Sequence, residues 1–79
     1  MDAGTIRGTL DADEAARNIV DNIPAGNKEK FYFVTFFCSG ENKMFVQKYA
    51  NNDYASYLMF GYSKTELSYH RKAAGTWKQ

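Results

Sequence analysis

The fold class of this chain is decided by one stretch, Phe31-Tyr32-Phe33-Val34-Thr35-Phe36-Phe37-Cys38. Aromatic and β-branched residues dominate it, and these residue types favour strands over helices. Because the stretch is apolar on both of its alternating faces, it is typical of a central strand that is covered on both sides. The sequence therefore predicts a sheet with residues 31–38 in its interior.

Three more strands are predicted downstream of this stretch, over residues 44–49, 54–62 and 67–71. Polar and glycine-containing turns separate them, at residues 39–42, 50–53 and 63–65. Connections this short favour antiparallel pairing of successive strands. We therefore expect a four-stranded antiparallel meander within residues 30–72.

One helix is predicted upstream, over residues 12–22. Asp11 is a good N-cap, and Glu14 three residues later completes a capping-box pattern. Pro24 ends the helix because it pushes the preceding residue out of the α region. An apolar stripe recurs at three- and four-residue spacing, formed by Ala12, Ala15, Ala16, Ile19 and Ile23. A helix packed on a four-stranded antiparallel sheet is an α+β domain.

The length of 79 residues indicates one domain over residues 1–79, with a sheet between an N-terminal arm or short strand at 1–10 and a C-terminal tail at 73–79. A core this small rarely supplies more than about 3–5 kcal/mol. Cys38 is the only cysteine and His70 the only histidine, so neither a disulfide within the chain nor a Cys/His metal site is expected. Good packing or self-association must stabilise the fold instead.

Self-association is also favoured by the apolar strand 31–38, because one helix can cover only one face of the sheet. A second subunit is the simplest cover for the other face, and the N-terminal arm or the Trp77 tail are alternatives. The two faces of this strand carry Phe31, Phe33 and Phe37 on one side, and Tyr32, Val34 and Phe36 on the other.

The charge balance and termini exclude several classes of partner. Ten basic and nine acidic residues give a net charge of +1, which provides no basic surface for nucleic acid. No apolar run approaches the roughly 20 residues that span a bilayer, so no membrane insertion is expected. The first residues lack the basic and apolar regions of a signal peptide. A lone cysteine fits a reducing compartment.

The sequence provides no constellation for catalysis, so no enzymatic activity and no cofactor are expected. The neighbours of His70, Tyr69 and Arg71, include no carboxylate that could orient it as a base. Cys38 ends an apolar strand and is expected to be a small buried residue without reactivity. An enzyme that borrows residues from a partner chain is the least favoured alternative.

The C-terminus carries the most informative motif, Tyr69-His70-Arg71 followed by Gly75-Thr76-Trp77. This pattern resembles the end of knob-like domains in phage and prophage tail fibres. The middle of the pattern corresponds to 51–54 and 60–62, and the segment 22–24 resembles its start. The closing aromatic residue of that family is missing, because the sequence ends with Lys78-Gln79.

The resemblance implies a receptor-binding fibre tip that works as a homo-oligomer, usually a trimer, and recognises a cell-surface glycan or protein. Such a protein would belong to a virion tail if phage-encoded. The alternative is a small intracellular protein-binding or inhibitor module, which would be cytoplasmic.

Candidate ligand-binding residues combine aromatic rings, which stack on sugar C–H faces, with groups that hydrogen-bond hydroxyls. Trp77 and the 51–54 loop rank first because both lie outside the strand cores. Packing is the alternative role for each tyrosine and for Trp77, which could serve as a lid on the sheet end. The candidates are Trp77, Tyr54, Asn51, Asn52, Asp53, Tyr57, Tyr69 and Arg71, with Tyr49 beside them.

Overall fold

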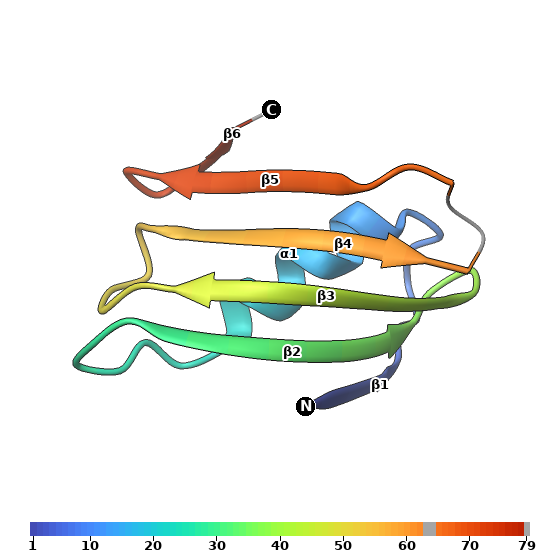
Figure 1. Ribbon diagram of the computed structural model, residues 1–79, viewed down its shortest axis with the longest axis horizontal. Coiled ribbons are helices and arrows are strands. Elements are labelled where there is room, and N and C mark those ends of the chain that lie inside the picture. Colours follow the sequence, from blue (N-terminus) through green and yellow to red (C-terminus); the bar gives the residue numbers. More distant parts are fainter. Residues whose placement is uncertain (63–64, 79) are drawn as a thin grey trace.

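In the computed structural model, which describes residues 1–62 and 65–78, one helix packs on one face of a six-stranded mixed sheet (Figure 1). The strands lie side by side in the order of the sequence, from β1 at one edge to β6 at the other. The elements are β1 (Asp2–Thr5), α1 (Ala12–Asn22), β2 (Lys30–Phe37), β3 (Glu41–Lys48), β4 (Ala55–Gly61), β5 (Ser68–Ala73) and β6 (Thr76–Lys78).

The prediction of a four-stranded antiparallel meander is wrong, because both ends of the chain add a strand. β2 to β5 pair antiparallel with their neighbours, but β1 pairs parallel with β2 and makes the sheet mixed. Without β1, the outer edge of β2 would expose unpaired backbone groups. The Met1 nitrogen donates to Phe33 O at 2.8 Å, and Thr35 N donates to Met1 O at 2.9 Å.

The C-terminal segment, expected to be a tail, is the short edge strand β6. It returns along β5 after a two-residue turn in which both residues have positive φ, 50° at Ala74 and 83° at Gly75. This turn geometry matches the twist of a tight hairpin, and glycine adopts it without strain. β1 and β6 contain only four and three residues, too few to produce a strand pattern in the sequence.

The helix α1 covers the range expected from the sequence. Asp11 caps it, with Oδ1 accepting from the Asp13 and Glu14 nitrogens at 2.9 and 3.4 Å. The other half of the predicted capping box is replaced by Thr9, whose hydroxyl accepts from Asp11 N and donates to Glu14. At the C-terminal end, the buried ammonium group of Lys48 in β3 donates to Val20 O at 2.7 Å.

The core lies between α1 and the sheet. Ala15, Ala16 and Val20 of the helix are completely buried. The helix contacts β3 and β4, which lie in the middle of the sheet. Cys38 is 2% exposed, as expected for a small apolar residue. The sheet supplies the remaining large buried side chains, Val34, Phe36, Met44, Val46, Tyr57 and Met59.

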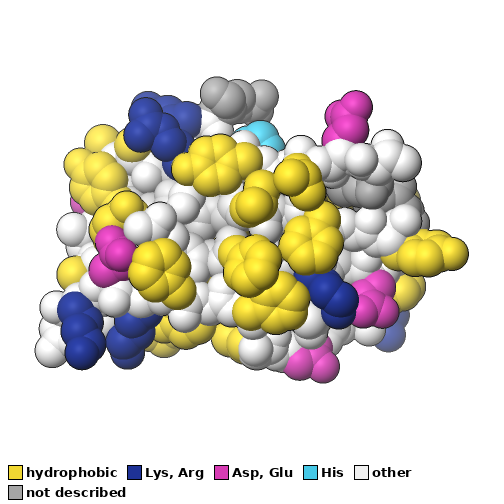
Figure 2. Space-filling view, in the orientation of Figure 1, with side chains coloured by type: hydrophobic (Ala, Val, Ile, Leu, Met, Phe, Trp, Pro, Cys, Tyr) yellow, Lys and Arg dark blue, Asp and Glu magenta, His cyan; other side chains and the backbone are white. Residues whose placement is uncertain are grey.

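The opposite face of the sheet carries no second layer, as Figure 2 shows in the orientation of Figure 1. Phe31 is 72% exposed and Phe45 55% exposed, and no segment within residues 1–62 and 65–78 packs over them. Neither alternative cover lies there, since Ile6 after β1 and Trp77 in β6 pack against the core on the helix side. We call this surface the open face; it is formed by Phe31, Phe33, Phe37, Phe45, Leu58, Phe60 and Tyr69.

Candidate functional site

A recess of about 550 Å³ lies at the end of the open face, beside the loop that joins β3 to β4. Aromatic rings of three tyrosines surround it, and an arginine and an asparagine contribute polar groups. We call it the tyrosine recess; its principal residues are Tyr49, Asn51, Tyr54, Tyr69 and Arg71.

The wall of the tyrosine recess is a well-fixed loop. Tyr49 N donates to Tyr54 O at 3.2 Å, which closes the loop at its base. The side chain of Asn51 accepts from Asp53 N at 2.9 Å, an Asx turn of the kind that asparagine favours. Gly75 N donates to Asp53 O at 3.1 Å and ties the loop to the β5–β6 turn. These contacts fix the backbone of the loop that carries Tyr49 and Tyr54.

Three residues in register across β3, β4 and β5 form the floor of the recess. Gln47 pairs with Ser56, and Ser56 pairs with Arg71. The Ser56 hydroxyl donates to Gln47 Oε1 at 3.4 Å. Arg71 forms no ion pair with any described side chain, so its guanidinium group can donate to a ligand. Together these side chains leave the Gln47 amide nitrogen and the Arg71 guanidinium as donors beside the tyrosine rings.

The structure brings together four of the eight residues predicted for the site, Asn51, Tyr54, Tyr69 and Arg71. Asn52 and Asp53 lie exposed in the same loop but do not line the recess. Sequence reasoning named Tyr49 beside the set and missed Gln47 and Ser56. The sequence signal that could have found them is the two-residue spacing along a strand, which puts Gln47 on the same face as Phe45, and Ser56 on the same face as Leu58.

The other two predicted site residues, Tyr57 and Trp77, lie on the helix side of the sheet. Tyr57 is 1% exposed and its hydroxyl donates to Asp13 at 2.8 Å. Trp77 Nε1 donates to the carboxylate of Asp21 in α1 at 3.2 Å. The two rings meet edge to face with centroids 5.5 Å apart. Both residues pack sheet against helix, the alternative role considered for each of them.

A polar cluster around Asp13 lies beneath the helix. Its carboxylate accepts from Tyr57 at 2.8 Å and from Ser68 at 3.3 Å, and it lies 3.7 Å from His70 Nε2. Burial raises the pKa of the Tyr57 phenol, and the hydrogen bond to Asp13 raises it further. The sequence neighbours of His70 provided no carboxylate, but the fold brings one from the helix.

The Asp13 cluster contains a serine, a histidine and an aspartate, yet its geometry differs from a nucleophilic triad. In a triad the histidine contacts the nucleophile and is oriented by the carboxylate. Here Ser68 and His70 both approach the carboxylate of Asp13. Within the described residues, no group of three or more His, Cys, Asp or Glu side chains could hold a metal ion. We assign this cluster to packing.

Lys48 is a second buried charged group. Burial lowers the pKa of its ammonium group, while the nearby Asp21 opposes that shift. A lysine with a lowered pKa is often a functional residue. Here its nitrogen donates to the carbonyl at the end of α1, where a positive charge also complements the helix dipole. The contact therefore anchors the helix to β3.

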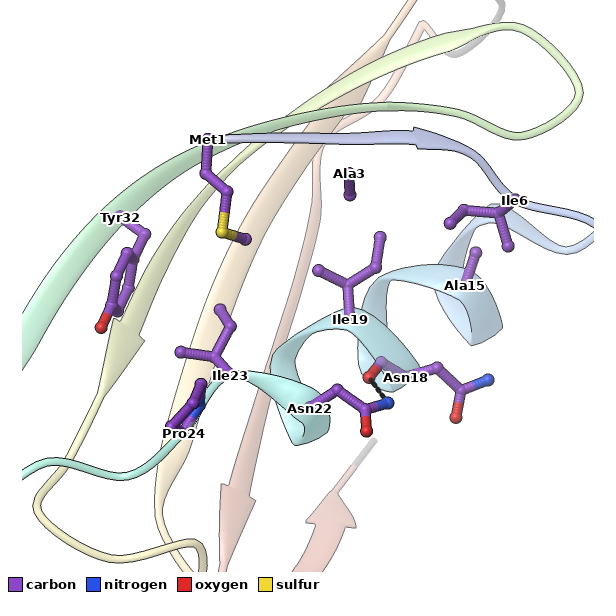
Figure 3. Close-up of a pocket in the computed structure, with 10 residues that line it drawn as sticks. All are labelled: Met1, Ala3, Ile6, Ala15, Asn18, Ile19, Asn22, Ile23, Pro24 and Tyr32. Carbon is purple, nitrogen blue, oxygen red and sulfur yellow. Dashed lines mark hydrogen bonds between the residues drawn. The ribbon is translucent and has the colours of Figure 1, made fainter.

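A second hollow of about 440 Å³ lies between α1 and β1, where the helix leaves part of the sheet uncovered (Figure 3). Met1, Ile19 and Ile23 extend into it from three sides. Its polar residues are already engaged in part, since Asn22 Nδ2 donates to Asn18 O at 2.8 Å. No carboxylate, histidine or cysteine is among the described residues that line it, so it offers little to orient a polar ligand.

No protein-family model, no curated protein and no solved structure matches this chain. In the described part of the chain, no helix has the length and apolar character needed to span a membrane. The function must therefore be argued from the tyrosine recess and the open face.

Proposed function

We propose that this chain is a non-enzymatic recognition module that binds a cell-surface saccharide in the tyrosine recess. One observation carries the proposal: the fold gathers three tyrosine rings, an arginine and an asparagine around one preformed hollow. The proposed role is that of a receptor-binding fibre tip, the class of protein that the C-terminal motif resembles. Under this proposal the chain works in a virion tail.

The chemistry of the recess suits a sugar. Tyrosine rings offer flat apolar surfaces for the C–H faces of a pyranose, and their hydroxyls provide a polar rim. The Arg71 guanidinium and the Gln47 amide can donate to ring hydroxyls or to a sugar carboxylate. The volume of about 550 Å³ lies within the range of small-ligand sites. A loop that is already fixed loses little conformational entropy on binding.

The alternative function is a small intracellular protein-binding or inhibitor module. The open face favours it, because exposed aromatic patches mark protein–protein contacts. The two functions share Tyr69, but Phe33 and Phe45 of the open face do not line the tyrosine recess, and Tyr54 and Arg71 of the recess are not among the rings of the open face. Substitutions in the recess therefore test the saccharide function without removing the open face.

The test is binding to a glycan array with neutral and acidic sugars, and to whole bacterial cells. Tyr54→Ala and Arg71→Ala each remove a recess side chain that lies at the surface and are expected to reduce binding about ten-fold or more, the factor for a loss of 1.4 kcal/mol. Tyr62→Ala is the matched control, because Tyr62 is 93% exposed and lies outside the recess.

Trp77→Phe is a second control that separates packing from ligand contact. It keeps an aromatic ring beside Tyr57, while it removes the Nε1 hydrogen bond to Asp21 and reduces the packing area of the ring; neither change touches the recess, so binding by the folded variant should be unchanged. If the folded native protein binds no glycan and no cell, the saccharide function is wrong. It is equally wrong if both recess variants fold and bind as well as the native protein.

A further inference from the structure

The open face is a feature of the molecule that the proposed saccharide site leaves unexplained. Figure 2 shows apolar side chains gathered over β2 to β5 on the side away from α1. Phe31 is 72% exposed, Phe45 55% and Tyr69 62%. Phe33 and Phe45 stack with ring centroids 4.9 Å apart, and Phe45 and Phe60 lie 6.3 Å apart. The rings therefore form one continuous apolar surface.

The exposed aromatic area of the open face is about two thirds of the area that each partner buries in a standard dimer interface. If a whole aromatic side chain presents about 200 Å², the exposed parts of Phe31, Phe33, Phe37, Phe45 and Tyr69 amount to about 550 Å². A standard interface buries about 800 Å² on each partner. The aromatic rings alone supply more than half of that area, and Leu58, Phe60, Thr35 and Gln47 lie among them on the same face.

The charges of this face favour an uncharged apolar partner over nucleic acid. Lys43 lies among the central rings, and its ammonium group pairs at 2.9 Å with Glu41 on the same face of β3. Arg71 stands at one end, in the tyrosine recess. A nucleic-acid surface needs a cluster of basic groups along the aromatic rings. A second copy of this face, whose described charges are the Lys43–Glu41 pair and Arg71 at one end, is the better match.

The shape of the face is complementary to itself. Phe31, the most exposed of its phenylalanines, projects near the start of β2. A mostly apolar hollow of about 440 Å³ lies at the opposite end, between Phe37, Phe60 and Tyr62, and the Glu41–Lys43 pair also lines it. Phe31 and Phe37 are six residues apart on one strand, a separation of about 20 Å. A twofold axis that runs across the strands places the Phe31 ring of each copy over the hollow of the other.

We propose that the open face pairs with the open face of a second copy of this chain, around a twofold axis that runs across the strands. The contact is isologous, so each copy contributes both a projecting Phe31 ring and a receiving hollow. The two sheets then stack about 10 Å apart, the usual spacing of face-to-face sheets. This pairing provides the small core with the additional apolar burial that a chain of this length lacks.

The test is sedimentation velocity of the intact protein over a range of micromolar concentrations. The native protein is expected to sediment with twice the mass of the chain. Phe45→Lys places a charge at the centre of the interface and should weaken dimerisation about ten-fold or more. Phe31→Lys removes the projecting ring with little risk to folding, since that side chain is 72% exposed.

Leu10→Lys is the matched control, because Leu10 is 86% exposed and precedes α1, outside the open face. This variant should dimerise like the native protein. Circular dichroism establishes which variants are folded. If Phe45→Lys does not fold, the result for Phe31→Lys alone tests whether the open face forms the dimer interface. A native monomer at all concentrations would leave the face to a different protein and overturn the proposal. A native trimer, or face variants that dimerise as tightly as the native protein, would also overturn it.

Discussion

Replacing Tyr57 with phenylalanine removes one hydroxyl from the core and keeps the ring in place. The Tyr57 side chain is 1% exposed, and its hydroxyl donates to the Asp13 carboxylate at 2.8 Å. The ring contacts Trp77 and His70 at centroid distances of 5.5 and 5.6 Å, and phenylalanine preserves both contacts. The change therefore removes only the contacts of the hydroxyl, which are the hydrogen bond to Asp13 in the first turn of α1 and an interaction with Arg17 of the same helix.

The expected loss in the free energy of unfolding is about 1.5–3 kcal/mol, the range for a hydrogen bond to a charged group. It also depends on pH, because burial and the bond to Asp13 raise the pKa of Tyr57 above its ordinary value of 10.0. A raised pKa in the folded state contributes stability that is complete below the unfolded pKa and is lost as pH rises above it. Above pH 10, the advantage of tyrosine over phenylalanine should shrink by up to about 1.4 kcal/mol per pH unit.

The measurement is urea unfolding followed by circular dichroism, from about pH 8 to about pH 11, a range that brackets the ordinary pKa of tyrosine. Native protein and Tyr57→Phe are compared at each pH, so that the other titrating groups largely cancel. Equal stabilities at pH 8 would refute the hydrogen bond to Asp13. A stability difference that stays constant across the alkaline range would refute the raised pKa.

Three further predictions concern the cap, the thiol and a crowded glycine. Asp11→Ala removes the carboxylate that accepts hydrogen bonds from the first amides of the helix. In urea titrations the free energy of unfolding should fall by about 0.5–2 kcal/mol. An unchanged midpoint would contradict the role of Asp11 as the cap. Cys38, 2% exposed, should react with a thiol reagent only in denaturant, and rapid labelling of the native protein would show that the strand end opens. Gly61→Ala places a methyl group against the Asn42 side chain, which cannot easily move because its amide nitrogen donates to Cys38 O and Gly40 O. Thermal unfolding should therefore show a free energy of unfolding that is lower by about 1–3 kcal/mol. An unchanged melting temperature would show that the Asn42 side chain moves aside.

The candidate site was only partly readable from the sequence. Residue type pointed to the 51–54 loop, Tyr69 and Arg71, because aromatic and hydrogen-bonding side chains outside a core are candidates in any sheet protein. It ranked the 51–54 loop, with Tyr54, above Tyr57, but it kept Tyr57 among the candidates because the two side chains have the same chemistry. Tyr54 precedes β4 and lines the recess, whereas Tyr57 shares the helix side with Met59 and is buried. Their roles differ because the helix packs on the sheet face that carries Tyr57, while Tyr54 stays at the surface.

Local sequence determined the helix and the four central strands of this protein. The cap at Asp11, the apolar stripe and Pro24 place α1, and the aromatic and alternating runs place β2 to β5, since both signals act over neighbouring residues. The sequence also indicated that one face of the sheet would be left without a helix to cover it.

The tertiary structure decided the edges of the sheet and the partners of its polar groups. β1 and β6 are too short to form alone and exist because the outer edges of β2 and β5 offer unpaired backbone groups. Asp13 meets Tyr57, Ser68 and His70, and Lys48 meets the end of α1, because the helix lies across β3 and β4. Those contacts join residues far apart in the chain, so only the packing of helix on sheet could determine them.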